Sequence, residues 1–200
     1  MTFSRDHQCR FPAYLVSGSH AHQRRFVAEH GKTWLSTCAR MKLRGAVVFD
    51  IDDTLIDGKQ EVVRGFQDML ETYQHAKRLG FPVYVVTARP DDDEEYVYGM
   101  LSRREIHVTP EHLKMLPAEH YNVEDDKERD ELITDFKFGK YLEFVKKHNR
   151  VLARFGDKLW DVCDKNTIVQ DLNHVSNRHC WIGRDCRQGM CVSYKLPGDG

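Results

Sequence analysis

The chain has no long hydrophobic run and no strong excess of either charge. None of its apolar stretches approaches the roughly 20 residues that a membrane-spanning helix needs. Its start does not combine a basic segment with an apolar one, as a secretory signal would. The formal net charge of -1 gives no overall attraction to nucleic acid or to an anionic membrane. These absences favour a cytoplasmic protein without a membrane partner, in which the six cysteines are reduced.

The charge is unevenly distributed, although its total is small. Residues 1–45 contain eight Lys and Arg residues against two Asp and Glu residues, a local net charge of +6. This basic start could contact an acidic partner, but an ordinary solvated helical face is the more common case. The sequence has no internal repeat and no low-complexity segment. Its 200 residues, of which 40% are hydrophobic, suit one domain with an appendage.

Short apolar runs alternate with amphipathic segments along most of the chain. Runs rich in β-branched or aromatic residues predict strands at 45–49, 81–86, 112–116 and 151–155. Apolar residues at three-to-four spacing predict helices at 20–43, 61–79, 92–104 and 138–148. Residues 1–19 and 117–131 are expected to be irregular. The alternation predicts an α/β fold in which a parallel sheet is sandwiched by helices.

The most informative stretch begins at Ala46. Four apolar residues lead into Asp50 and Asp52, and Asp53 and Thr54 follow. On a regular strand Asp50 and Asp52 would share one face, and two close carboxylates repel each other unless a positive charge lies beside them. A divalent cation such as Mg2+, which takes oxygen ligands, is the simplest partner. A capped helix start would explain one or two of these polar residues, but not three carboxylates beside a buried strand.

Polar side chains also follow two further predicted strands, namely Thr87 and Arg89 after one and Asp157 and Asp161 after the other. The carboxyl ends of parallel strands meet at one edge of a sheet, where α/β proteins bind ligands. A lysine is needed nearby to offset the carboxylates, and Lys137 and Lys140 are the two candidates. A metal, a hydroxyl donor and a cationic side chain together suit the binding of a phosphate group.

These residues follow the order and approximate spacing of the four motifs of the haloacid dehalogenase (HAD) superfamily: Asp50–Leu55, Thr87, Lys137 and Gly156–Asp161. The resemblance covers about residues 45–163. Within the superfamily, the chain looks most like the acid phosphatase branch that includes bacterial class B enzymes and plant vegetative storage proteins. That finer likeness depends on Val47–Leu55, Val85–Pro90, Phe136–Lys140 and Phe155–Asp157.

The resemblance implies a HAD-like, Rossmann-like core at 45–200, with 1–44 as an N-terminal helical extension. Only about seven residues separate Thr54 from the helix predicted at 61, so no cap domain fits there. We therefore expect an essentially capless core whose mouth is covered by N-terminal helices. The core is expected to end in a Cys-rich hairpin at about 174–195.

The resemblance also implies a role for each site residue. Asp50 is the expected nucleophile and forms an aspartyl-phosphate, while Asp52 serves as general acid and then general base. Thr87 binds phosphoryl oxygens, and Lys137, which the family pattern favours over Lys140, neutralises their charge. The implied Mg2+ ligands are Asp50, Asp157, Asp161 and the backbone carbonyl of Asp52. Thr54 and Arg89 are assigned to substrate binding, although Arg89 could equally be a surface residue beside the turn.

These expectations describe a Mg2+-dependent phosphomonoester hydrolase, a phosphatase acting on phosphorylated small molecules, nucleotides included. Two alternatives are a 3′-phosphatase acting on nucleic-acid ends and a non-catalytic storage or binding protein that retains the fold. Cys180, Cys186 and Cys191, with His174, form a second cluster of residues that could bind zinc or contain a Cys180–Cys191 disulfide. The irregular spacing favours a hairpin whose thiols are incidental.

Overall fold

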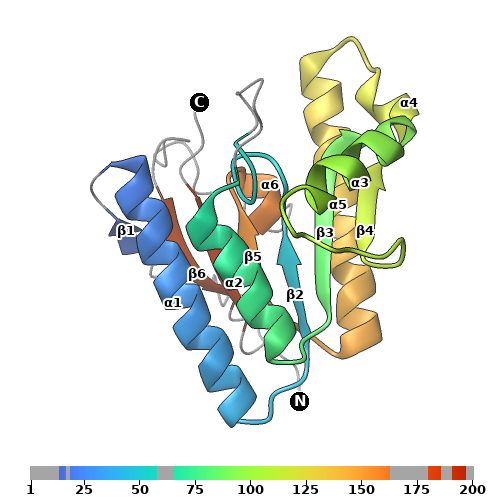
Figure 1. The fold of residues 1–200 in the computed structure, drawn as a ribbon. Coiled ribbons are helices and arrows are strands. Elements are labelled where there is room, and N and C mark those ends of the chain that lie inside the picture. Colours follow the sequence, from blue (N-terminus) through green and yellow to red (C-terminus); the bar gives the residue numbers. More distant parts are fainter. Residues whose placement is uncertain (1–13, 17–18, 58–64, 163–179, 186–190, 197–200) are drawn as a thin grey trace, which may run out of the picture.

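A seven-stranded sheet is the centre of the computed structural model, which describes residues 14–16, 19–57, 65–162, 180–185 and 191–196 (Figure 1). The strand order across the sheet is β1-β6-β7-β5-β2-β3-β4. The five strands from β7 to β4 are parallel: β7 (Cys191–Lys195), β5 (Val151–Gly156), β2 (Ala46–Phe49), β3 (Val83–Pro90) and β4 (Leu113–Leu116). Strand β6 (Cys180–Asp185) is antiparallel to β7, and β1 (Tyr14–Val16) is antiparallel to β6.

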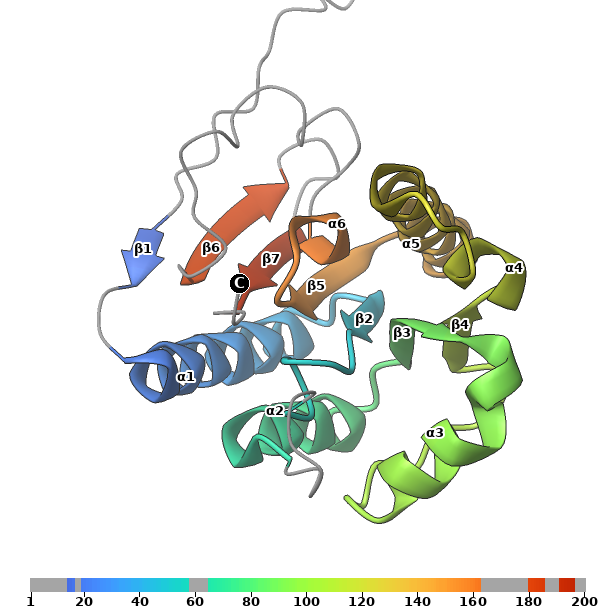
Figure 2. The same cartoon turned by 90° about the horizontal axis from the view of Figure 1, so that it is seen from above.

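Helices cover both faces of this sheet, as the view from above shows (Figure 2). Helices α1 (His20–Arg40), α2 (Gln67–Arg78) and α3 (Glu94–Ser102) lie on one face, and α5 (Asp126–His148) lies on the other. The short elements are the 3-10 helix Asp91–Asp93, α4 (Ala118–Tyr121) and α6 (Leu159–Val162). The predicted α/β fold, a parallel sheet sandwiched by helices, is therefore confirmed. Within the described residues, no helix combines the length and the hydrophobicity needed to span a bilayer.

Each face of the sheet has its own hydrophobic core. Val83 and Val85 of β3 belong to the core beneath α1, α2 and α3, whereas Tyr84 and Val86 belong to the core beneath α5. Tyr84 stacks on Phe144 of α5 with ring centroids 3.9 Å apart. Because β3 is buried on both faces, its apolar run is continuous rather than alternating, which is typical of parallel sheets.

Residues before the first predicted strand are part of the same sheet and core. Residues 14–16, expected to be irregular, form the edge strand β1. Helix α1 packs on the sheet, where the Trp34 indole N–H donates to the Leu152 carbonyl at 2.9 Å. It runs along the sheet beside α2 rather than over the carboxyl ends of the strands (Figure 1). The expectation that N-terminal helices cover the mouth of the site is therefore wrong.

Helix α5 begins at Asp126, well before the helix predicted at 138–148, so part of the expected loop 117–131 is helical. The Asp125 side chain caps it by accepting a hydrogen bond from the Glu128 amide at 2.8 Å. Its first turns are acidic and mostly exposed, so hydrophobic periodicity does not reveal them, although acidic residues stabilise a helix start. Helix α2 begins at Gln67 rather than at 61.

The segment between β2 and α2 is short. Ile56 forms an antiparallel bridge with Gly65, which leaves only residues 57–64 for an insertion. At the other end of the chain, β6 and β7 form the expected hairpin. Its register pairs Cys191 with Asp185, so five residues at about 3.3 Å each separate Cys180 from the position opposite Cys191. A disulfide needs Cα atoms within about 7 Å, so the Cys180–Cys191 alternative is wrong. His174 and Cys186 lie outside the described residues, as do the thiols of Cys180 and Cys191.

Candidate active site

The site lies where the connections from the central strand reverse. Helix α2, which follows β2, covers one face, and α5, which leads into β5, covers the other (Figure 2). Such a switch point leaves a crevice at the carboxyl ends of the two strands. Asp50 lies at this point, and its amide donates to the Phe155 carbonyl of β5 at 2.9 Å. The Asp157 side chain follows β5 in the chain.

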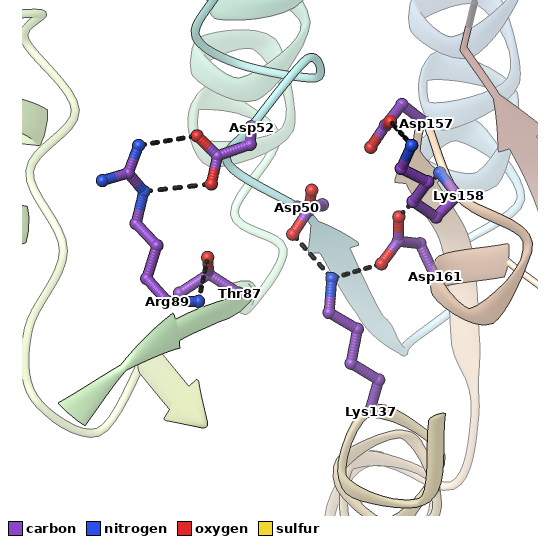
Figure 3. Close-up of polar contacts among 8 residues, drawn as sticks. All are labelled: Asp50, Asp52, Thr87, Arg89, Lys137, Asp157, Lys158 and Asp161. Atoms are coloured by element: carbon purple, nitrogen blue, oxygen red, sulfur yellow. Dashed lines mark hydrogen bonds and ion pairs between the residues drawn. The ribbon is translucent and has the colours of Figure 1, made fainter. Parts of the chain in front are cut away.

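Lys137 of α5 joins two of the carboxylates. Its ammonium group donates to the Asp50 carboxylate at 2.8 Å and also to Asp161 (Figure 3). The side chains of Lys137, Asp50 and Asp161 are only 5%, 7% and 3% exposed. Lys140, the other candidate, pairs instead with Glu143 at 3.1 Å on the exposed side of α5. The structure thus places Lys137, and not Lys140, beside Asp50.

Three carboxylates of this site lie close enough to share one metal ion. Oxygen atoms of Asp50, Asp157 and Asp161 all lie within 4.8 Å of one another. Burial, only partly offset by Lys137, raises the pKa of Asp50 well above its usual range. Burial and the neighbouring Asp161 raise the pKa of Asp157 to about 7. These shifts indicate an excess of buried negative charge, and a hard divalent cation with oxygen ligands fits this donor set.

Lys137 keeps its charge in this buried setting. Burial by itself would lower the pKa of the ammonium group, but Asp161 and Asp50 more than compensate, so its pKa is raised. Lys158 adds a weaker contact, with its ammonium group 3.6 Å from the Asp157 carboxylate and its backbone amide donating to Asp161 at 3.0 Å. The single positive charge of Lys137 does not balance the charge of three carboxylates, so a bound cation would be stabilised here.

Asp52 lies on the opposite side of Asp50 from Asp157 and Asp161 (Figure 3). A tight turn carries it, in which the Ile51 carbonyl accepts from the amides of Leu55 and Ile56. Asp53 takes a left-handed φ of 50°, which aspartate tolerates better than most residues. The Asp52 carboxylate is not one of the three carboxylates that lie close enough to share a metal ion. The metal contact predicted for Asp52 would therefore use only its backbone carbonyl.

The Asp52 side chain instead forms a two-point ion pair with Arg89 of β3. Arg89 Nη2 donates to Asp52 Oδ1 at 2.7 Å, and Arg89 Nε donates to Asp52 Oδ2 at 3.0 Å. The Arg89 side chain is 22% exposed and that of Asp52 is 39% exposed, so the pair lies at the rim of the site. Although burial by itself would lower the pKa of Arg89, the bond to Asp52 raises it. No sequence pattern predicts this pair, because its two members are 37 positions apart in the chain.

The two threonines of the predicted site are both fully buried. Thr87 Oγ1 accepts a hydrogen bond from the Arg89 amide at 3.1 Å, which leaves the Thr87 hydroxyl hydrogen available to a bound anion. The Thr54 hydroxyl has no hydrogen-bond partner among the described residues. The structure does not place Thr54 on the accessible surface of the site, so a direct substrate contact would need local opening.

Gly156 is a site residue whose role the sequence did not reveal. A Cβ atom added at Gly156 would lie 2.1 Å from the Cβ atom of Asp161. Only glycine therefore allows the Asp161 side chain to fold back over the end of β5 toward Lys137. A glycine between a buried strand and an aspartate is a signal for such close approach.

Comparisons with known proteins give a fold and no family assignment. No protein-family model matches the sequence, and no curated protein sequence matches it either. Among solved structures, the chain is similar to the class C acid phosphatase from Bacillus anthracis and to the same enzyme with tungstate bound. Each comparison has a TM-score of 0.55 and 16% sequence identity, and covers 73% of this chain.

The similarity extends over 66% of each phosphatase chain, slightly less than two thirds of its length. Class C acid phosphatases belong to the HAD superfamily, so the likeness agrees with the HAD-like fold expected from the motifs. At 16% identity, it shows the fold alone. Placement near class B enzymes and plant storage proteins remains a prediction.

Proposed function

We propose that the protein is a metal-dependent phosphomonoester hydrolase in which Asp50 is the nucleophile. The observation that carries the proposal is the buried ion pair of Asp50 and Lys137, 2.8 Å apart within a group of three carboxylates. The ammonium group holds the Asp50 carboxylate in place by bonding to Oδ1, and it does not bond to the other oxygen, Oδ2. A fixed, partly neutralised carboxylate at a strand end is suited to attack on phosphorus.

The reaction would take place in two displacements at phosphorus. In the first, Asp50 forms a bond to phosphorus, the bond to the leaving-group oxygen breaks, and Asp52 gives this oxygen a proton. In the second, water attacks the aspartyl-phosphate and gives a proton to Asp52, and the bond to Asp50 breaks. The products are an alcohol and inorganic phosphate, and both carboxyl groups return to their starting states.

Other residues of the site would bind the phosphoryl group and the metal. Arg89 and the Thr87 hydroxyl would donate hydrogen bonds to phosphoryl oxygens, while Lys137 offsets their charge. Asp50, Asp157 and Asp161 would hold the metal, for which we propose Mg2+ because all the donors are hard oxygens. When bound, Mg2+ would neutralise negative charge on the phosphoryl oxygens.

For the substrate we propose a phosphorylated small molecule, with nucleotides included in that class. The short connection between Ile56 and Gly65 leaves little chain with which to enclose a substrate. The structural neighbours are acid phosphatases, which supports the same class of reaction. The nucleic-acid alternative has less support, because the basic helix α1 runs along the face of the sheet and not around its carboxyl edge (Figure 1).

Turnover of p-nitrophenyl phosphate tests this proposal. We expect the wild-type protein to release p-nitrophenol with Mg2+, to lose this activity with EDTA, and to regain it when Mg2+ is returned. Asp50→Asn should abolish turnover, whereas Asp92→Asn removes a charge from an exposed position outside the site and should retain it. Full activity of Asp50→Asn, or of the wild-type protein in EDTA, would show that the proposed mechanism is wrong.

A further inference from the structure

The residue proposed to move protons is bound to another side chain. Both carboxylate oxygens of Asp52 accept hydrogen bonds from Arg89, at 2.7 and 3.0 Å. Figure 3 shows the pair to one side of Asp50, with the carboxylate of Asp52 directed toward Arg89. To reach a leaving group bound at Asp50, the side chain of Asp52 has to leave this pair. Arg89 therefore holds the Asp52 carboxylate to one side of Asp50.

The edge of Arg89 that binds Asp52 is also the edge that faces the site. The Nε and Nη2 groups point toward Asp52, whereas the remaining nitrogen lies on the side away from Asp50 (Figure 3). The same pair of parallel N–H groups is the one that binds a phosphate at two points. One edge of a guanidinium cannot bind two such partners at once. Asp52 and an incoming phosphate must then compete for it.

The position of Arg89 brings that edge within the site. Its amide is bonded to the Thr87 hydroxyl at 3.1 Å, and Thr87 is fully buried next to Asp50 on the neighbouring strand. Backbone anchoring fixes where the side chain starts, while its 22% exposure leaves the guanidinium free to change partner. Because the pair is partly exposed, its strength is modest, and a phosphate dianion can displace the carboxylate.

We infer that Arg89 is a positioning residue that couples phosphate binding to the release of Asp52. In the ion pair, Arg89 binds Asp52 and directs its carboxylate away from Asp50. A phosphate takes over the Nε and Nη2 groups, and the released Asp52 carboxylate is free to take up a proton from the solvent and bring it to the leaving-group oxygen. The inference depends on the proposed function, and it adds that the general acid reaches its working position only after the phosphate has arrived.

Binding of inorganic phosphate, without turnover, tests the competition directly. Calorimetric titrations in one Mg2+ buffer would compare wild type, Asp52→Asn, Arg89→Ala and the double variant. Asp52→Asn should tighten phosphate binding about 3- to 10-fold, because it removes the competing partner of a partly exposed pair. In the Arg89→Ala background the same substitution should change binding less than about twofold, since the contested edge is gone.

Matched variants separate competition from a general effect of charge. Asp92→Asn removes one charge from an exposed residue of the short helix that follows β3, and it should leave phosphate binding unchanged. Arg89→Lys retains the charge but not the two-point edge, and it should bind phosphate more weakly than wild type while still folding. The unfolding midpoint of each variant, from circular dichroism, confirms that the folded proteins are compared.

Several outcomes would overturn the inference. If Asp52→Asn tightens binding equally with and without Arg89, the effect is general repulsion rather than competition. If Asp52→Asn weakens binding, the two side chains bind phosphate together. Absence of phosphate binding in all variants counts against both the inference and the proposed function. Mg2+-dependent hydrolysis without coupling between the two substitutions would overturn only the inference.

Discussion

Replacing Lys137 with methionine removes the one buried ammonium group from three carboxylates while keeping an apolar stem of similar length. Lys137 is 5% exposed and bonds to both Asp50 and Asp161. Removing one partner of a buried ion pair typically costs about 3–5 kcal/mol of folding stability, because it leaves charge buried without a partner. We expect a loss of this size at about pH 8 in metal-free buffer, measured by urea unfolding.

The loss should be smaller in acid. The pKa of Asp157 is about 7, and that of Asp50 is raised well above its usual range, so the folded protein retains protons that the unfolded chain has released. Raised carboxyl pKa values mean that stability is present at low pH and is lost as pH rises through the folded pKa. Without Lys137 the pKa of Asp50 rises further, so Lys137→Met should be destabilised less at about pH 5 than at about pH 8.

The same substitution should lower kcat/KM for p-nitrophenyl phosphate by about 100- to 1,000-fold, the usual effect of removing one electrostatic group from a reaction centre. Lys140→Met is the matched control, because Lys140 pairs with Glu143 at the surface and such pairs contribute about 0.3–0.5 kcal/mol. Equal losses in the two variants, or a Lys137→Met protein with wild-type activity and stability, would refute the reasoning.

Two further predictions concern stability. Gly31→Ala places a Cβ atom 2.8 Å from the buried ring of Phe155, so urea unfolding should show a loss of about 1–3 kcal/mol. Gly139→Ala meets no atom within 4 Å and should instead stabilise α5 by up to about 1 kcal/mol; a stabilising Gly31→Ala would contradict this account. Burial and nearby cations lower the pKa of His75 from 6.5, and its ring lies 2.8 Å from the Ser36 hydroxyl. The unfolded chain then binds more protons, so the unfolding free energy should fall as pH drops from about 7 to about 5, and less so in His75→Gln. An identical pH dependence in both proteins would be evidence against this role.

The sequence determined the parallel strands and the carboxylates at their ends. Strand β2 and the first half of β3 are continuous apolar runs because both of their faces are buried, and β5 differs only by the buried Arg154; this pattern is local. Asp50 and Thr87 follow these runs directly and Asp157 follows after Gly156, so the predicted strands also predict that the polar groups meet at one edge. Helix α5 begins at Asp126 and not at the predicted residue 138, because its exposed first turns carry no hydrophobic periodicity.

The tertiary structure decided which side chains face one another. Lys137 and Lys140 are three positions apart on α5, and only packing against the sheet shows which of them turns inward to Asp50. The pairing of Asp52 with Arg89 joins the ends of two different strands. Periodicity determines local conformation, whereas the direction of a side chain depends on partners that folding brings together. The sequence therefore located the carboxylates, and only the fold showed that the proposed general acid is bound away from the proposed nucleophile.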